Sequence, residues 1–147
     1  MNAVLRAAQP LDAGRVGDIL WRFQEDTPWM PKLHATAETI SFCGAMIEQG
    51  LVRVAVEGGR VQGFVARRGE EILSLYLAAE AQGRGLGARL LLEAQGASPN
   101  LKLWTFQRNT GAQRFYERHG FVEVERTDGS GNDENLPDIR YRWERRA

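Results

Sequence analysis

A glycine-rich segment in the middle of the chain has the residue types and spacing of an anion-binding loop. It reads Gln-Gly-Arg-Gly-Leu-Gly-Ala-Arg over residues 82–89, follows an apolar predicted strand and opens a predicted helix. Free N–H groups and the positive dipole end at a helix N-terminus attract phosphate, and glycines allow a close backbone approach. Arg84 and Arg89 can add positive charge. The segment therefore predicts a phosphate- or pyrophosphate-binding site.

Three interpretations of this segment compete. Gly83, Gly85 and Ala88 match a dinucleotide-binding fingerprint, which requires an early βαβ unit and an acidic residue at the end of the next strand. The motif comes late in this chain, and the next predicted strand ends in Phe-Gln-Arg-Asn over residues 106–109, without an acid. A Walker loop is excluded because no Gly-Lys-Ser/Thr follows. An ordinary glycine-rich turn is the third interpretation of the segment taken alone.

A second motif follows the glycine-rich segment and favours one class of protein. Residues 109–121 read Asn-Thr-Gly-Ala-Gln-Arg-Phe-Tyr-Glu-Arg-His-Gly-Phe, and residues 82–87 fit Gln-x-x-Gly-x-Gly. In this order the two motifs resemble those of the GNAT superfamily of N-acetyltransferases. The resemblance is strong over residues 50–125, and the order of predicted elements extends it to the whole chain. It implies transfer of an acetyl group from acetyl-CoA to a primary amine, by direct attack in a ternary complex.

The resemblance also implies which residues bind acetyl-CoA or CoA. In that superfamily the pyrophosphate lies on backbone amides of the glycine-rich loop, and the pantetheine arm pairs with the preceding strand, where the sheet splays. A backbone N–H of that strand would polarise the thioester carbonyl. The residues expected to bind the cofactor are Leu75, Tyr76, Leu77, Gln82, Gly83, Arg84, Gly85, Leu86, Gly87, Ala88, Asn109, Ala112 and Tyr116.

Acid–base chemistry is expected from Tyr116 and Glu71. The resemblance makes Tyr116 the general acid, because a phenol near the sulfur can protonate the departing CoA thiolate. Its alternative role is a core aromatic beside Phe115. A general base must take a proton from the acceptor ammonium. The resemblance makes Glu71 the expected base, because histone-type members of the superfamily carry their catalytic Glu at this place before the glycine-rich loop. The alternative for Glu71 is a solvated carboxylate after a turn. Asn109 is expected to contact the cofactor arm, to cap the following helix, or both.

The acceptor pocket is expected at the loop between the first two predicted helices, because this loop lines it in the proteins that the chain resembles. This loop also supplies further candidates for the base in Glu25, Asp26 and His34. Asp133 and Glu134, in the polar segment 128–138, can attract a cationic amine, although a solvated hairpin loop is the simpler interpretation. The residues expected to bind the acceptor are Trp21, Glu25, Asp26 and Trp29, with Phe23 and Met30 in the same wall.

The rest of the sequence predicts the elements that must position these groups. Alternating apolar residues predict strands, and apolar residues at helical spacing predict helices. The Gly-Gly pair at 58–59 predicts a two-residue hairpin turn, and the strand 71–77 is apolar enough to predict burial on both faces. The predicted strands are 3–8, 51–57, 61–67, 71–77, 101–106, 121–126 and 139–144; helices run from Asp12 to about Phe23, from Thr36 to Gly50, from the glycine-rich loop to Ala94, and from Thr110 to His119.

This order of elements and the chain length bound the fold. The 147 residues, of which 43% are hydrophobic, fit a single domain over residues 1–147. We expect an α/β (α+β) fold with a mixed, mainly antiparallel central sheet of about seven strands and about four helices packed on both faces. Basic and acidic residues balance at 19 each, so neither nucleic acid nor an anionic membrane is expected as a partner.

Cysteine content and targeting signals narrow the class further. The lone Cys43 lies in an apolar helical pattern and excludes an internal disulfide, and no metal site is expected. We find no secretion signal or membrane span in the sequence and expect a cytoplasmic protein. The expected partner is a small-molecule or peptide amine, with a homodimer left open. The alternative function is a CoA-binding regulatory or sensor module of the same fold; a nicotinamide oxidoreductase is disfavoured by the missing acid.

Overall fold

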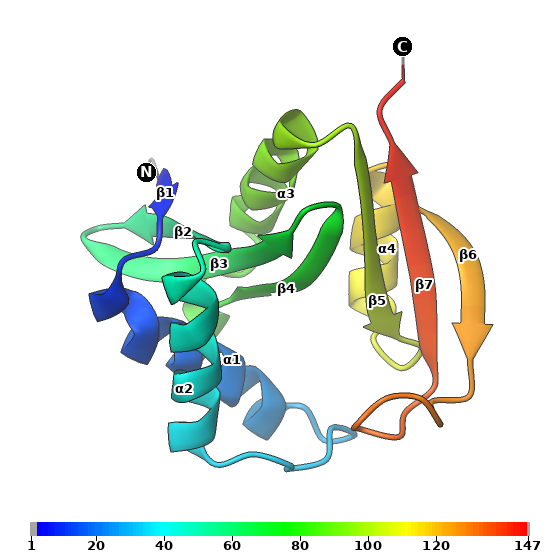
Figure 1. Cartoon of the computed structure of the whole chain (residues 1–147), viewed down its shortest axis with the longest axis horizontal. Helices are drawn as coiled ribbons and strands as arrows, with labels where there is room; N and C mark the ends of the chain where they lie inside the picture. Colours follow the sequence, from blue (N-terminus) through cyan, green and yellow to red (C-terminus); the bar gives the residue numbers. More distant parts are fainter. Residues whose placement is uncertain (1–2, 147) are drawn as a thin grey trace.

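The computed structural model describes residues 3–146, which form one seven-stranded sheet with four α-helices and two short 3₁₀ helices (Figure 1). The predicted domain, 1–147, also includes residues 1, 2 and 147, which lie outside the described residues. No helix in residues 3–146 is long and apolar enough to cross a membrane. The strands are Val4–Ala7 (β1), Val52–Glu57 (β2), Arg60–Arg68 (β3), Glu71–Leu77 (β4), Asn100–Phe106 (β5), Val122–Thr127 (β6) and Asp138–Glu144 (β7); the helices are Ala13–Asp26 (α1), Thr36–Glu48 (α2), Leu86–Ala97 (α3) and Thr110–Arg118 (α4), with 3₁₀ helices Pro10–Asp12 (η1) and Ala79–Ala81 (η2).

The start of α1 differs from the prediction that the Asp12 side chain caps this helix. Asp12 ends η1 and already has helical backbone angles, with φ −79° and ψ −12°. Its carboxylate instead accepts hydrogen bonds from the Arg6 guanidinium and, at 2.7 Å, from the Gln9 backbone N–H. An N-cap side chain reaches the first free N–H groups from an extended backbone, so the preceding 3₁₀ helix takes Asp12 out of the capping position.

The sheet has the strand order β1-β2-β3-β4-β5-β7-β6. Its neighbouring strands are antiparallel except β4 and β5, which are parallel. The mixed, mainly antiparallel sheet predicted from the sequence is therefore confirmed. The hairpin turn between β2 and β3 is also confirmed, because Gly58 and Gly59 have φ of +60° and +76°, the left-handed region that such a turn requires.

The parallel pair β4–β5 separates almost as soon as it forms. Its register consists of Glu71 opposite Lys102, and Figure 1 shows the two strands diverging from that end. A bulge lies at the start of the divergence, because Ala66 pairs with Ser74 and Arg67 with Ile72, leaving Leu73 as the extra residue on β4. Bulges bend a strand and increase its twist, so this one turns β4 away from β5.

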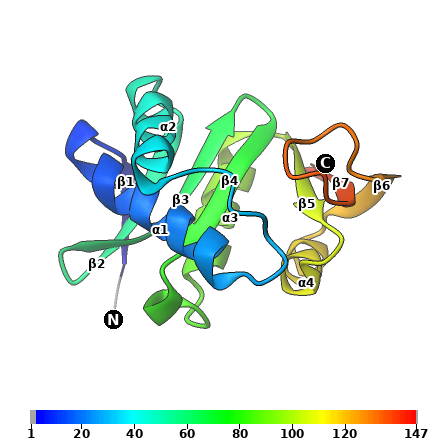
Figure 2. The same cartoon turned by 90° about the horizontal axis from the view of Figure 1, so that it is seen from below.

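Helices cover both faces of the sheet, as Figure 2 shows from a second direction. On β3, Phe64 and Ala66 pack in the core beneath α1 and α2, while Val65 between them packs in the core beneath α3 and α4. The alternation follows from the period of two along a strand. The prediction that β4 is buried on both faces is wrong, since Leu73 is 37% exposed and residues 74–77 are only partly buried. The cause is the departure of β5, which leaves one edge of β4 uncovered.

Candidate active site

Two adjoining cavities border the uncovered edge of β4. The larger has a volume of about 650 Å³ and extends from β4 across β5 to the loop between β6 and β7. The smaller, of about 370 Å³, extends from β4 to the glycine-rich loop and α4. We call them the acceptor-side and the loop-side cavity. The residues that line both are Phe23, Leu75, Tyr76, Asn109, Ala112 and Tyr116.

The glycine-rich loop forms one end of the loop-side cavity through Gln82, Gly83 and Gly87. Gly85 is the N-cap of α3 with φ +83°, and the first backbone hydrogen bond of the helix runs from the Arg89 N–H to the Gly85 carbonyl at 3.1 Å. The N–H groups of residues 86–88 therefore have no partner within the helix. Free N–H groups at the positive end of a helix dipole are suited to a phosphate.

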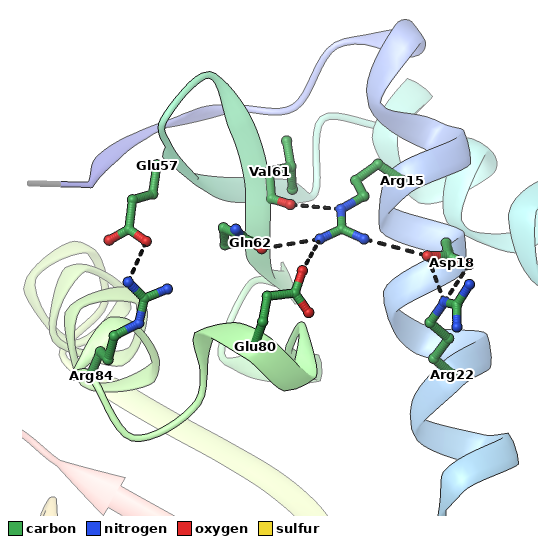
Figure 3. Close-up of polar contacts among 8 residues, drawn as sticks. All are labelled: Arg15, Asp18, Arg22, Glu57, Val61, Gln62, Glu80 and Arg84. Atoms are coloured by element: carbon green, nitrogen blue, oxygen red, sulfur yellow. Dashed lines mark hydrogen bonds and ion pairs between the residues drawn. The ribbon is translucent and has the colours of Figure 1, made fainter. Parts of the chain in front are cut away.

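The side chains of Arg84 and Arg89 bind other groups of the protein, contrary to the prediction that they add charge to the phosphate site. Arg84 forms an ion pair with Glu57 at 2.7 Å, and the carboxylate-bearing side chain of Glu57 is only 8% exposed (Figure 3). The Arg89 guanidinium donates to the Ala3 carbonyl. A nearly buried carboxylate requires a counter-charge, which explains why Arg84 turns toward the end of β2. The backbone of Arg84 still belongs to the loop.

Contacts of the Arg15 guanidinium fix the segment that leads into the glycine-rich loop. The Arg15 guanidinium donates to the Val61 carbonyl at 2.8 Å and to the Gln62 amide oxygen at 3.0 Å, and it pairs with Glu80 at 3.1 Å (Figure 3). Glu80 lies in η2, directly before the loop. Arg15 thereby ties α1, β3 and η2 together, so the loop is held in position relative to the sheet.

Tyr116 lies where the two cavities meet. Its ring packs against Phe115 and Phe121, with centroids 5.2 and 5.5 Å away, and it is 8% exposed. Within residues 3–146 the Tyr116 hydroxyl has no hydrogen-bonding partner. Every fully buried side-chain polar atom in that range has a partner, so this hydroxyl is not fully buried and opens onto a cavity. Burial raises the pKa of Tyr116 above its usual value. The side chain is therefore both a core aromatic and a neutral phenol presented to the cavities.

Asn109 caps α4 and also lines the two cavities. Its side-chain oxygen accepts a hydrogen bond from the Ala112 N–H at 3.1 Å, which confirms the prediction that it caps α4. The same residue lines both cavities. The cap fixes the start of α4, and Tyr116 follows two turns later on the side that faces the sheet.

Glu71, the expected base, lies outside both cavity linings. Its two carboxylate oxygens each accept a hydrogen bond of 2.8 Å from the Arg140 guanidinium. A carboxylate held in this bidentate way is not positioned to take a proton from an acceptor amine. No local pattern identifies this partner of Glu71, because Arg140 lies on β7, far away along the chain.

The residues expected to bind the acceptor are also displaced from the cavities. Trp21, Glu25, Asp26 and Trp29 line neither of them, and neither does His34; of the predicted wall, Phe23 does. The Lys32 ammonium donates to the carbonyls of Gln24, Glu25 and Thr27 at the end of α1, and so holds the α1–α2 loop close to that helix. Trp29 contributes indirectly, since its ring meets Phe106 of the acceptor-side cavity at 5.8 Å.

The β6–β7 loop walls the acceptor-side cavity, so of the two interpretations of segment 128–138 the structure favours a border of this cavity over a simple solvated hairpin loop. The loop contributes Ser130, Gly131, Asn132 and Glu134 to the lining. The Asn132 amide donates to the Leu136 carbonyl at 2.8 Å, and its oxygen accepts from the Leu136 N–H at 3.2 Å. This cross-link folds the loop back on itself, and the loop therefore presents a fixed polar wall.

Two carboxylates line the acceptor-side cavity, and they differ in their partners. Asp138 is bound on both oxygens, by the Thr127 hydroxyl and by the Asn132 amide at 3.1 Å. Within the described residues, no hydrogen bond or ion pair engages Glu134. Burial and then the charge of Glu134 raise the pKa of Tyr76, on the opposite wall, to about 12. Glu134 is thus an unpaired negative charge facing the cavity.

Much of the acceptor-side lining was not foreseen from the sequence. It comes from consecutive residues of β4 and β5, which an ordinary sheet would bury between neighbouring strands and helices. The bulge and the divergence expose them together, and neither leaves a mark in the hydrophobic pattern. No three His, Cys, Asp or Glu side chains gather as a metal site between residues 3 and 146. The lining residues that were not predicted as part of the site are Ile72, Leu73, Ser74, Leu103, Trp104, Thr105, Phe106 and Thr127.

Known proteins resemble this chain in sequence and in fold. The model of the acetyltransferase (GNAT) domain family matches residues 48–123. The peptidyl-lysine N-acetyltransferase YiaC of Escherichia coli (strain K12) is 35% identical over 70 residues, a match that covers 47% of this chain and 48% of that protein. The solution structure of apo-form YjaB from Escherichia coli superposes with a TM-score of 0.81 at 19% identity, covering 99% of this chain and 100% of that one. The structure of YncA from Salmonella typhimurium, described as a putative acetyltransferase with its cofactor acetyl-CoA, has a TM-score of 0.75 at 19% identity and covers 100% and 96% of the two chains.

Proposed function

This chain belongs to the GNAT acetyltransferase family, and we propose that it transfers the acetyl group of acetyl-CoA to a primary amine within one domain, residues 1–147. The observation that carries the proposal is the junction of the two cavities at Tyr116. One cavity ends at free helix N–H groups, which suit a pyrophosphate, and the other contains an unpaired carboxylate, which suits an ammonium. Donor and acceptor can then meet at the junction in a ternary complex.

The donor would be bound mainly by backbone groups. Among the described residues, the N–H groups of residues 83–85 and 86–88 have no backbone partner and are free to hold the pyrophosphate, whereas the Gln82 N–H donates to the Ala79 carbonyl at 3.4 Å. The uncovered edge of β4 at Leu75–Leu77 offers N–H and C=O groups with no strand beside them, which fits an extended, amide-containing arm. Gln82, Gly83 and Gly87 line the cavity next to this edge, which supports the assignment. The predicted cofactor-binding residues are retained, with Arg84 contributing through its backbone.

Tyr116 would act as the general acid. In the reaction the amine nitrogen forms a bond to the acetyl carbon, the bond from that carbon to sulfur breaks, and the thiolate takes a proton. Tyr116 can supply that proton because its raised pKa keeps the phenol protonated at neutral pH and its hydroxyl has no competing partner among residues 3–146. The proton lost by the amine leaves through the polar wall of the acceptor-side cavity or through water. We do not assign this step to Glu71, because Arg140 occupies both of its oxygens.

The acceptor would be a small-molecule or peptide amine. YiaC, which matches over about half of each chain, is a peptidyl-lysine N-acetyltransferase by name. A lysine side chain is therefore one source of the amine that has to be tested, beside free amines.

Thiol release tests the proposal. Purified protein is mixed with acetyl-CoA and a panel of primary amines, free CoA thiol is followed with a colorimetric reagent, and the acetylated amine is identified by mass. Amine-dependent release with a matching product supports the enzyme. Tight acetyl-CoA binding with no release on free amines or lysine peptides would contradict it and would favour the CoA-binding sensor module.

A further inference from the structure

The residues that line the acceptor-side cavity determine which amines can bind in it. We propose that Glu134 recognises the acceptor ammonium and that the cavity selects a primary amine on an uncharged, largely apolar stem. This inference rests on the proposed function, since it names the substrate class of the same site. It makes Glu134 a substrate-binding residue, placed on the loop between β6 and β7.

Charge in the cavity is the first argument. Glu134 and Asp138 are the acidic residues of the lining, and no Lys, Arg or His belongs to it. Asp138 is nearly buried and uses both oxygens to bind Thr127 and Asn132, so it serves the wall itself. Glu134 has no partner among the described residues. A single unpaired carboxylate in a partly enclosed cavity attracts a single cation.

Placement of that carboxylate is the second argument. Asn132 fastens the loop through its hydrogen bonds to Leu136 and to Asp138, so Glu134 is presented from a fixed wall. On the facing side Tyr76, whose pKa is raised in part by the charge of Glu134, belongs to the residues that line both cavities. Glu134, Tyr76 and Tyr116 thus line one and the same cavity, so an ammonium bound to Glu134 shares that cavity with the Tyr116 side chain.

The apolar remainder of the lining is the third argument. Most of the side chains that β4 and β5 contribute to the lining are aliphatic or aromatic, as is Phe23 of α1; Ser74 and Thr105 are the polar exceptions on these two strands. A methylene or aryl stem gains free energy from burial against such a lining. A second ammonium would lose its hydration there without a second free carboxylate to replace it. Polyamines and other polycations are therefore disfavoured. The apolar lining residues are Phe23, Ile72, Leu73, Leu75, Leu103, Trp104 and Phe106.

Two sources share this chemistry, namely a free alkylamine and the side chain of lysine. The test uses n-pentylamine for the first, Nα-acetyl-lysine methylamide for the second, and 1,5-diaminopentane as the matched dication. Glu134→Gln removes the charge and keeps the shape. Asp133→Asn is the control, because the neighbouring Asp133 is exposed and does not line the cavity. Thermal unfolding confirms that both variants fold.

We expect the wild-type protein to prefer the monoamines to the diamine. Glu134→Gln should raise KM for the amine by about tenfold to a hundredfold, the usual weight of a hydrogen bond to a charged group, and leave KM for acetyl-CoA unchanged. Asp133→Asn should behave like wild type. Turnover of one monoamine but not the other identifies the source of the amine, and either result supports the proposal.

Separate outcomes overturn the inference and the proposed function. Glu134→Gln with the same amine KM as Asp133→Asn, or a wild-type preference for the diamine, overturns the role of Glu134 while turnover stands. If no amine is acetylated, calorimetric titration of n-pentylammonium into the CoA-saturated protein still tests whether Glu134 binds the ammonium. Binding that weakens in Glu134→Gln alone supports the inference although the enzyme proposal fails, and binding that does not depend on Glu134 overturns both.

Discussion

Glu71 on β4 and Arg140 on β7 form a bidentate ion pair that passes over β5, next to the point where β4 and β5 pair. Both hydrogen bonds measure 2.8 Å, and the side chains are 26% and 15% exposed. The Arg140 guanidinium also lies over the Trp104 ring, 5.0 Å from its centroid. The pair fastens three strands at the origin of the divergence. It therefore fixes the angle at which β4 leaves β5, and with it the width of the acceptor-side cavity.

Glu71→Gln is predicted to lower the stability of the fold and to leave the catalytic groups in place. Loss of one partner leaves a partly buried guanidinium incompletely satisfied, which costs about 1–3 kcal/mol of the free energy of unfolding. Urea unfolding measures this loss. Activity should decline through KM for the amine, as the cavity changes width, and the shape of the pH–rate profile should be retained.

A charge exchange is the control for this pair. Glu71→Arg combined with Arg140→Glu should recover part of the stability that either single change removes, because the two groups can pair again. A Glu71→Gln variant with wild-type stability that loses turnover together with one limb of the pH–rate profile would contradict the structural role of the Glu71–Arg140 pair. It would support Glu71 as the general base.

Stability is predicted to fall steeply at high pH. Burial raises the pKa of Tyr116, burial raises that of Tyr76 to about 12, and burial together with a hydrogen bond to Glu117 raises that of Tyr141. Burial likewise raises the pKa of Cys43 to about 11. The folded state holds these protons more tightly than the unfolded chain, in which the cysteine titrates near pH ~8.5 and the tyrosines near pH ~10. The stability that these groups contribute is therefore fully present below about pH 8 and is lost as pH rises through the folded-state values.

Urea midpoints at about pH 8 and about pH 11 measure this effect, with the midpoint lower at the higher pH. Tyr116→Phe removes one of the titrating groups and should lose less stability between the two values than wild type. Equal midpoints for the wild-type protein at both pH values would contradict the burial of these groups.

Gly85→Ala is predicted to impair both folding and donor binding. Gly85 has φ +83° and open space around the position of a Cβ, so the penalty arises from the backbone and amounts to about 1–2 kcal/mol. Any relaxation of φ moves the free N–H groups of residues 86–88, and KM for acetyl-CoA should rise. Calorimetry and acetyl-CoA titration check the two effects.

The matched control for this change lies on the same helix. Gly96 is exposed near the end of α3, without a positive φ and with nothing near its Cβ position, so Gly96→Ala should stabilise the protein by about 0.5–1 kcal/mol. Unchanged acetyl-CoA binding is expected for it. Equal effects of the two substitutions would show that the left-handed conformation of Gly85 has no special role.

Most features set by local sequence were predictable, and features set by distant partners were not; the Asp12 cap is a local prediction that failed, because η1 precedes α1. The turn at Gly58–Gly59, the glycine N-cap of α3 and the Asn109 cap depend on residues within one turn of each other, and the structure contains each of them. The partners of Glu71 and Arg84 lie on other strands, and no local pattern identifies them. The same reason explains why the acceptor wall was placed on α1 near Trp21, when the diverging strands and the β6–β7 loop supply it.

The most direct test of the enzyme proposal is the kcat of Tyr116→Phe in amine-dependent thiol release. Tyr141→Phe is the matched control, because Tyr141 is buried, binds Glu117 and lines neither cavity. The account predicts that Tyr116→Phe lowers kcat by about 10²- to 10⁴-fold, the usual contribution of a general acid, with KM for acetyl-CoA nearly unchanged, whereas Tyr141→Phe loses stability and keeps its kcat. A Tyr116→Phe protein that turns over at the wild-type rate would contradict the role assigned to the junction of the two cavities.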